Sequence, residues 1–65
     1  MRTIIRIDHV EKKENTQTGE PYYKTYATLD DGTEAEGFGK DFDIQEKVEV
    51  FYDKKWDVVK MAKRR

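Results

Sequence analysis

The chain has 65 residues, with no cysteine, 13 Lys and Arg and 14 Asp and Glu, which give a formal net charge of −1. This length allows one domain with one thin core, and the lack of cysteine excludes disulfide bonds and thiolate metal sites. The balanced charge excludes the global basic excess typical of proteins that coat duplex DNA, so any nucleic-acid site has to be local.

The N-terminal residues 1–10, MRTIIRIDHV, predict a first strand, because β-branched residues recur there with imperfect alternation. We place Ile5 and Ile7, which share one parity, in the core. Charges at Arg2 and Arg6 leave no apolar stretch long enough for a signal peptide or a membrane span. We therefore expect a cytoplasmic protein with no membrane contact.

Residues 11–21, EKKENTQTGEP, are polar and rich in turn formers, which predicts a loop or the tip of a hairpin. Four further strands are expected at residues 22–29, 33–39, 47–52 and 56–61, and residues 40–46 leave room for one helical turn. The short loop at residues 53–55 predicts an antiparallel hairpin between the last two strands. Residues 62–65, AKRR, are interpreted as the frayed basic tail of a single domain covering residues 1–65.

The turn Asp30, Asp31 and Gly32 sets the register of the second and third strands. A two-residue turn would place Leu29 opposite Glu34 and mix apolar with acidic side chains on one face. A three-residue turn with Gly32 in the left-handed region pairs Leu29 with Thr33 instead. The inner face then holds Tyr23, Thr25, Ala27 and Leu29 across from Thr33, Ala35, Gly37 and Gly39. The outer face holds Tyr22, Lys24, Tyr26 and Thr28 across from Glu34, Glu36, Phe38 and Lys40.

The expected interior extends beyond this hairpin into the last two strands. Parity places Val48, Val50 and Tyr52 inside and Phe51 outside, with Ile44 just before them in the core. Trp56 and Val58 are expected to point inward from the fifth strand.

These strands predict an all-β fold, namely a small five-stranded antiparallel OB-like barrel. Gly37 and Gly39 suit a strand that bends sharply to close such a barrel. A small SH3-like barrel has the same number of strands and is the rival fold.

Two stretches, GEPYYKTYATLDDGTEAEGF at residues 19–38 and FDIQEKVEV at residues 42–50, resemble strands two to four of OB-fold single-stranded-DNA-binding modules, including small phage-encoded ones. The resemblance covers roughly two thirds of the chain and implies that the outer face of strands two and three binds the nucleic-acid strand. Two features depart from it. The connection after the third strand is too short for a full helix, and Glu34 and Glu36 would repel phosphate.

The outer aromatic residues Tyr22, Tyr26 and Phe38 are candidates for base stacking, which needs no sequence readout because every base has a π-face. Lys24 and Lys40 lie among them and are candidates for phosphate contacts. The same exposed aromatic side chains also suit the centre of a protein interface, or an ordinary strand surface.

Two loop lysines, Lys12 and Lys13, border the groove that OB folds use, where a mobile cationic arm would close over a bound strand. Ordinary solvation explains these lysines equally well. The basic residues of the C-terminal stretch KMAKRR, namely Lys60, Lys63, Arg64 and Arg65, have two similar interpretations, long-range attraction of nucleic acid or simple solubility.

Catalytic and metal-binding patterns are missing from the sequence. The single His9 has no partner at ligand spacing, and Asp41 and Asp43 lack the pattern of a calcium loop. The chain has no serine and no Gly-rich phosphate loop. We therefore expect no catalytic residue, no metal ligand, no cofactor and no enzyme activity.

The resulting hypothesis is a monomer or homodimer that binds single-stranded nucleic acid, DNA in preference to RNA. The alternative is a small interaction protein or inhibitor that presents the same aromatic and acidic hairpin face to a protein partner.

Overall fold

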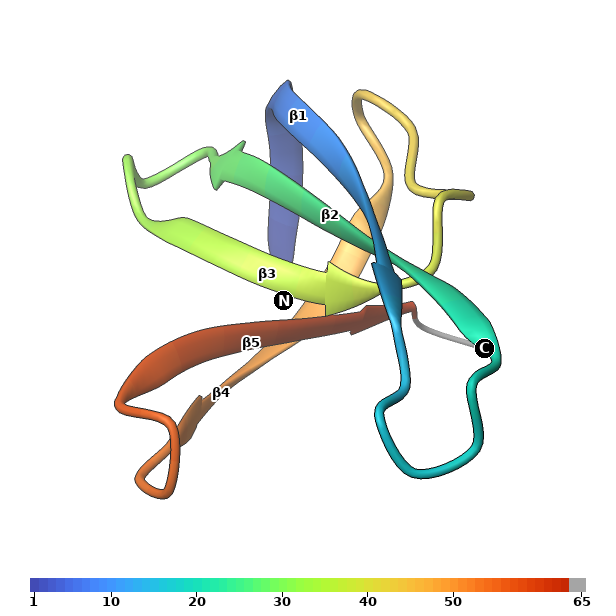
Figure 1. Cartoon of the computed structure of the whole chain (residues 1–65). Helices are drawn as coiled ribbons and strands as arrows, with labels where there is room; N and C mark the ends of the chain where they lie inside the picture. The colour runs from blue at the N-terminus through green and yellow to red at the C-terminus, as the bar shows by residue number, and fades with distance from the viewer. Residues whose placement is uncertain (64–65) are drawn as a thin grey trace.

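The computed structural model describes residues 1–63 and is a single five-stranded sheet with no helix in that range. The strands are β1 (Arg2–Glu14), β2 (Pro21–Leu29), β3 (Glu34–Phe38), β4 (Lys47–Asp53) and β5 (Val58–Lys63). They close into a barrel in the order β1-β2-β3-β5-β4 (Figure 1). The expected all-β, five-stranded barrel is confirmed. Residues 40–46, where one helical turn had room, form turns and bends.

One strand pair departs from the antiparallel pattern. The connection after β3 leads to β4 at the far side, so β5 enters the ring between β3 and β4 and runs parallel to β3. This parallel pair is aligned at Glu36 and Lys60, and β1 meets β4 only through Arg2 and Thr3. The barrel is therefore closed unevenly, with two short contacts between longer hairpins.

The predicted register of β2 and β3 is confirmed. Ala27 pairs with Ala35 and Tyr26 with Glu36, and Gly32 adopts a φ of 84°. The backbone amide of Gly32 donates to the carbonyl of Leu29 at 2.9 Å. The three-residue turn follows because only this register puts the small and apolar side chains together on the inner face.

The predicted parity of β1 is wrong in its first half. Ile4 is fully buried, whereas Ile5 is 53% exposed. The register against β2 shifts between Ile4 and Arg6 and again between Ile7 and His9. A bulge inserts an unpaired residue and reverses the alternation that follows, so Ile4 and Ile7 both face the core although they differ in parity.

The core gathers residues from all five strands and one loop. Its buried members are Ile4, Ala27, Leu29, Ala35, Phe42, Val48 and Met61, and Ile7, Val50 and Val59 pack against them. Phe42 comes from the β3–β4 connection, where the prediction left room for one helical turn and placed no core residue before Ile44, whereas Ile44 is exposed instead of buried. A Cβ on Gly37 would lie 2.7 Å from Phe42 Cζ, so this glycine makes room for the ring.

The β4–β5 turn also differs from the prediction. It comprises four residues, 54–57, with Asp57 at a φ of 54°, and it aligns Tyr52 with Val59. The extra residue reverses the parity of β5, so Val59 and Met61 face inward in place of Trp56 and Val58. Trp56 lies exposed in the turn, and Tyr52, although it has the inward parity, is exposed because β4 runs past the end of the core.

The first and the last strand, β1 and β5, both extend further toward the C-terminus than predicted. β1 continues to Glu14, and the hairpin tip is closed by backbone bonds between Asn15 and Glu20 and between Gly19 and Asn15. Ala62 and Lys63, predicted to be frayed, complete β5. The rest of the predicted tail, residues 64–65, lies outside the described residues. No helix within residues 1–63 is long and apolar enough to cross a membrane.

Candidate functional site

The outer face of β2 and β3 carries an aromatic groove at the end where β3 terminates. The rings of Tyr22 and Phe38 lie with their centroids 6.1 Å apart and tilted by 55°. They line a hollow of about 590 Å³ together with Trp56 and the tip of the β1–β2 hairpin. Phe38 is 67% and Trp56 63% exposed. We call this hollow the first groove. In Figure 1 the β1–β2 and β4–β5 loops project toward the same side of the barrel.

Cations surround the Phe38 side of the first groove. The Lys24 and Lys60 ammonium groups lie 5.8 Å and 5.0 Å from the centroid of the Phe38 ring. Lys55 lies 5.3 Å from the ring of Trp56. Glu14 and Glu20 line the hairpin side of the groove, so its positive charge is concentrated on β2, β5 and the β4–β5 turn.

Glu36 holds the two strand lysines in place. Its Oε1 accepts from Lys24 Nζ at 2.7 Å and from Lys60 Nζ at 3.0 Å. Lys60 is only 6% exposed, and a buried ammonium requires such a partner. Two cations share one carboxylate, so this cluster keeps a net positive charge. The predicted repulsion between Glu36 and phosphate is thereby offset.

The same contacts shift the ionisation of the pair. The hydrogen bond from Lys24 is the largest cause that lowers the pKa of Glu36 below its usual 4.5, with burial acting in the opposite direction and Lys60 adding a second bond. The hydrogen bond to Glu36 raises the pKa of Lys24 above its usual 10.5. Glu36 and Lys24 therefore both carry charge at neutral pH.

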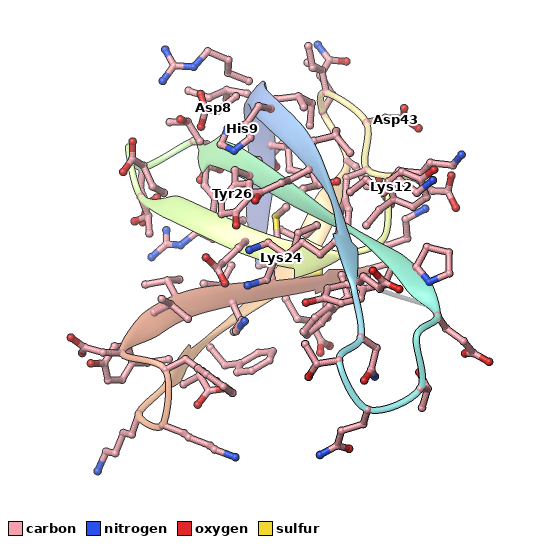
Figure 2. The ribbon with its side chains drawn as sticks, in the orientation of Figure 1. Asp8, His9, Lys12, Lys24, Tyr26 and Asp43 are labelled. Carbon is pink, nitrogen blue, oxygen red and sulfur yellow. The ribbon has the colours of Figure 1, made fainter. Side chains whose placement is uncertain are left out.

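The other end of the outer face has a different character. The ring of Tyr26 stacks on His9 with centroids 4.3 Å apart and 15° between the planes, and Figure 2 shows the two side chains together above Lys24. Another hollow, of about 510 Å³, opens beside them. Carboxylates from three separate segments line it, namely Asp8 of β1, Glu34 and Glu36 of β3, and Asp57 of the β4–β5 turn. We call this the acidic groove. Tyr26 thus has one ring face covered and anionic neighbours around the hollow beside it.

The remaining predicted site residues lie apart from the first groove. Lys40 is placed over the ring of Tyr23, 4.7 Å from its centroid. Lys13 pairs with Glu11 at 3.4 Å. Lys12 is exposed in the β1 arm of the hairpin (Figure 2), aligned with Tyr23. Of the seven predicted residues, the structure brings Tyr22, Lys24 and Phe38 together.

Sequence reasoning missed Trp56, Lys60 and His9 as members of this face. Trp56 was predicted in the core because the predicted β4–β5 turn, residues 53–55, is one residue shorter than the observed turn, which includes Trp56. Lys60 was predicted only as part of the basic C-terminal stretch, and the predicted parity gave it the same side as Trp56 and Val58. The four-residue turn sets it opposite Phe51 instead. The pairing of His9 with Tyr26 depends on the bulges in β1, and no pattern in the sequence predicted these bulges.

Within the described part of the chain, no group of three or more His, Asp or Glu side chains is arranged to hold a metal ion. No protein-family model, no curated protein and no solved structure matches this chain. The candidate site therefore rests on its own geometry.

Proposed function

We propose that this protein binds single-stranded nucleic acid in the first groove, with DNA as the first substrate to test. Bases stack on Tyr22, Phe38 and Trp56, and phosphates approach the ammonium groups of Lys24 and Lys55. Lys60 is buried against Glu36 and adds its positive charge without touching the phosphate. The observation that carries the proposal is the first groove itself: the exposed rings of Phe38 and Trp56 and the half-buried ring of Tyr22 meet in one hollow with lysines beside them.

The position of the groove supports the same proposal. In five-stranded OB barrels, oligonucleotides lie on the face of strands two and three between the loops that join strands one to two and four to five. The first groove is lined by residues from those same four places. Stacking tolerates any base, so binding is expected to depend little on sequence and to weaken as salt rises.

The choice of a single strand over a duplex follows from the chemistry of the surface. Aromatic side chains stack on the π-faces of bases, which a duplex hides between neighbouring pairs. The overall charge of the chain is −1, so the barrel lacks the broad basic surface that duplex phosphates require. We expect modest affinity from one such unit.

The test is a titration of fluorescently labelled oligo-dT at low salt, followed by anisotropy, for the wild type and for Phe38→Ala and Trp56→Ala. Each substitution should weaken binding by about 1 to 3 kcal/mol, with little change in the thermal unfolding midpoint because both side chains are exposed. Ile44→Ala is the control, since Ile44 is exposed but lines no part of the groove. Wild-type protein that fails to bind any single strand at low salt contradicts the proposal.

A second candidate function is supported by the acidic groove. Its carboxylates and the stacked pair of His9 and Tyr26 offer a surface suited to a basic segment of a protein partner, in line with cation–π and charge pairing. Under this function oligo-dT binding is absent, and Glu34→Gln weakens capture of a Lys- and Arg-rich peptide.

A further inference from the structure

The aromatic surface does not end at Phe38. On the other side of the Phe38 ring lies another hollow, of about 350 Å³, bounded by Phe51 of β4 and floored by residues of β5. We call it the second groove. Phe38 lines both the first and the second groove, so the two hollows share one ring as their boundary.

The alternation along β5 explains why this hollow exists. Met61 points into the core and is buried, whereas Ala62 points outward and is exposed. β3 and β5 run parallel in the register that aligns Glu36 with Lys60, which sets Phe38 beside Ala62. A methyl group between two large rings leaves an open space, and the ring of Phe51, aligned with Lys60, forms its far wall.

The charges along the second groove match those beside the first. Lys60 lies at the boundary, with Nζ 5.0 Å from the centroid of the Phe38 ring. Lys63 follows on β5, with Nζ 5.8 Å from the ring of Phe42. Asp53 contributes a carboxylate at the other end of the hollow. Lys60 is paired with Glu36, and Lys63 Nζ lies 3.9 Å from a carboxylate oxygen of Glu46. The cations of this groove are thus balanced by carboxylates, but the side chain of Lys63 is 45% exposed and open to a phosphate.

We propose that the nucleic-acid strand bound in the first groove continues over Phe38 into the second groove, where a further base stacks on Phe51 and a phosphate meets Lys63. This inference rests on the proposed function and adds the path and the extent of the bound strand. Its basis is the continuity of the two hollows at one exposed ring, together with the lysines that follow the same line.

The distance between the rings sets the length of oligonucleotide that reveals this path. Phe38 and Phe51 lie on strands separated by one intervening strand, which is about 10 Å at roughly 4.8 Å per strand spacing. A strand that fills both grooves therefore needs several nucleotides, within the site size of about 4 to 16 nucleotides found for single OB barrels. A short oligonucleotide fills one groove only.

The experiment compares oligo-dT of about 2 and about 12 nucleotides on the wild type, Phe38→Ala, Phe51→Ala and Ala62→Leu, because two nucleotides at about 3.4 Å each do not span the roughly 10 Å between the rings and the longer strand lies within the site size of one barrel. The longer strand should lose about 5- to 150-fold in affinity with Phe51→Ala and should also weaken with Ala62→Leu, which fills the hollow and leaves every ring in place. The shorter strand should stay within about two-fold for both variants and still weaken with Phe38→Ala, because it binds mainly in the first groove. In NMR titrations, the methyl signal of Ala62 should shift more with the longer strand.

Ile44→Ala is the matched control, with an exposed apolar side chain that lines neither groove. Affinity for the longer strand that depends on Phe38 but not on Phe51 or Ala62 overturns the extended path and leaves the proposed function in place. Wild-type protein that binds neither length contradicts the proposed function and the path together. Equal losses for both lengths with Phe51→Ala also overturn the path, because a short strand in the first groove does not reach that ring.

Discussion

The two ends of the outer face of β2 and β3 carry the same kinds of side chain in different arrangements. At the end near the β1–β2 hairpin tip, Phe38 lies open, with lysines beside it and its nearest carboxylate, Glu36, neutralised. At the other end, Tyr26 is stacked on His9 beside a hollow lined by carboxylates. An aromatic side chain on the correct face is therefore not yet a stacking site. Its ring must also be uncovered, and the charge around it must suit the ligand.

This difference changes the weight given to the predicted residues. Tyr26 was chosen because its parity places it outside, and parity does place it there. Parity does not predict which side chain of the adjacent strand lies beside Tyr26. Here that side chain covers the Tyr26 ring. Phe38 and Tyr26 should accordingly respond in opposite ways to substitution, and the following predictions measure that contrast.

The largest effect should come from the core that supports both ends. Leu29 is fully buried, so Leu29→Ala should lower the free energy of unfolding by about 2 to 5 kcal/mol and remove the functions of both ends together. Ile5→Ala, at a neighbouring but exposed position, should change stability by less than about 0.5 kcal/mol. Urea unfolding followed by circular dichroism measures both. A larger loss for Ile5→Ala than for Leu29→Ala would contradict the bulged register of β1.

The next effect separates the two ends directly. Phe38→Ala should weaken oligo-dT binding by about 1 to 3 kcal/mol and leave stability nearly unchanged. Tyr26→Ala should lose the aromatic pair with His9, worth about 0.5 to 1.5 kcal/mol beyond its buried area, and should affect binding much less. Anisotropy titrations and thermal unfolding of both variants give the comparison. Equal losses of binding for the two variants would show that the strand runs over Tyr26 as well.

A smaller effect concerns the Glu36 cluster and its dependence on pH. The pKa of Glu36 is lowered in the folded protein from its usual 4.5, so its stabilising contribution is present above about 4.5 and is lost as the pH falls through the lowered value. The pKa of Lys24 is raised from 10.5, so its contribution is lost only above that pH. The stability difference between the wild type and Glu36→Gln should therefore shrink as the solution is acidified. A difference that grows toward low pH would contradict this assignment.

The smallest expected effect concerns the reason that Tyr26 is a poor stacking site. His9→Ala uncovers one face of the ring but leaves Asp8, Glu34 and Asp57 in place. Because these carboxylates still repel phosphate, the affinity for oligo-dT should change by less than about two-fold. The double variant that combines His9→Ala with Glu34→Gln should bind oligo-dT more tightly than His9→Ala alone. Strong tightening with His9→Ala alone would assign the effect to the covered ring and not to charge.

The parts of the fold that follow local rules could be predicted from the sequence. The segment Asp30, Asp31 and Gly32 specified its turn because only one loop length keeps Ala27 and Ala35 on the same inner face as Leu29. That single inference placed Tyr22, Lys24 and Phe38 together on the outside. It is the reason that much of the first groove was foreseen.

The errors in the predicted fold arise at two kinds of position. One is where an extra residue is inserted in a strand or turn, and the other is where a loop side chain packs into the core. The bulges of β1 and the fourth residue of the β4–β5 turn each reverse an alternation that the residue types alone do not reveal. Phe42 reaches the core from a loop because Gly37 leaves a space that belongs to the folded backbone. Contacts of this kind depend on the closed barrel. The presence of Trp56 and Lys60 in the candidate site could therefore not be predicted from the sequence.

The exposure of Trp56 in the turn before β5 has a spectroscopic consequence. It is the single tryptophan of the chain, and 63% of it is already in contact with water in the folded state. Its emission should resemble that of a solvated indole before and after denaturation, so a conventional fluorescence melt should show little change. The same indole should be quenched when a base stacks on it. The intrinsic tryptophan emission of this protein is thus expected to change when the first groove is occupied and to change little when the protein unfolds.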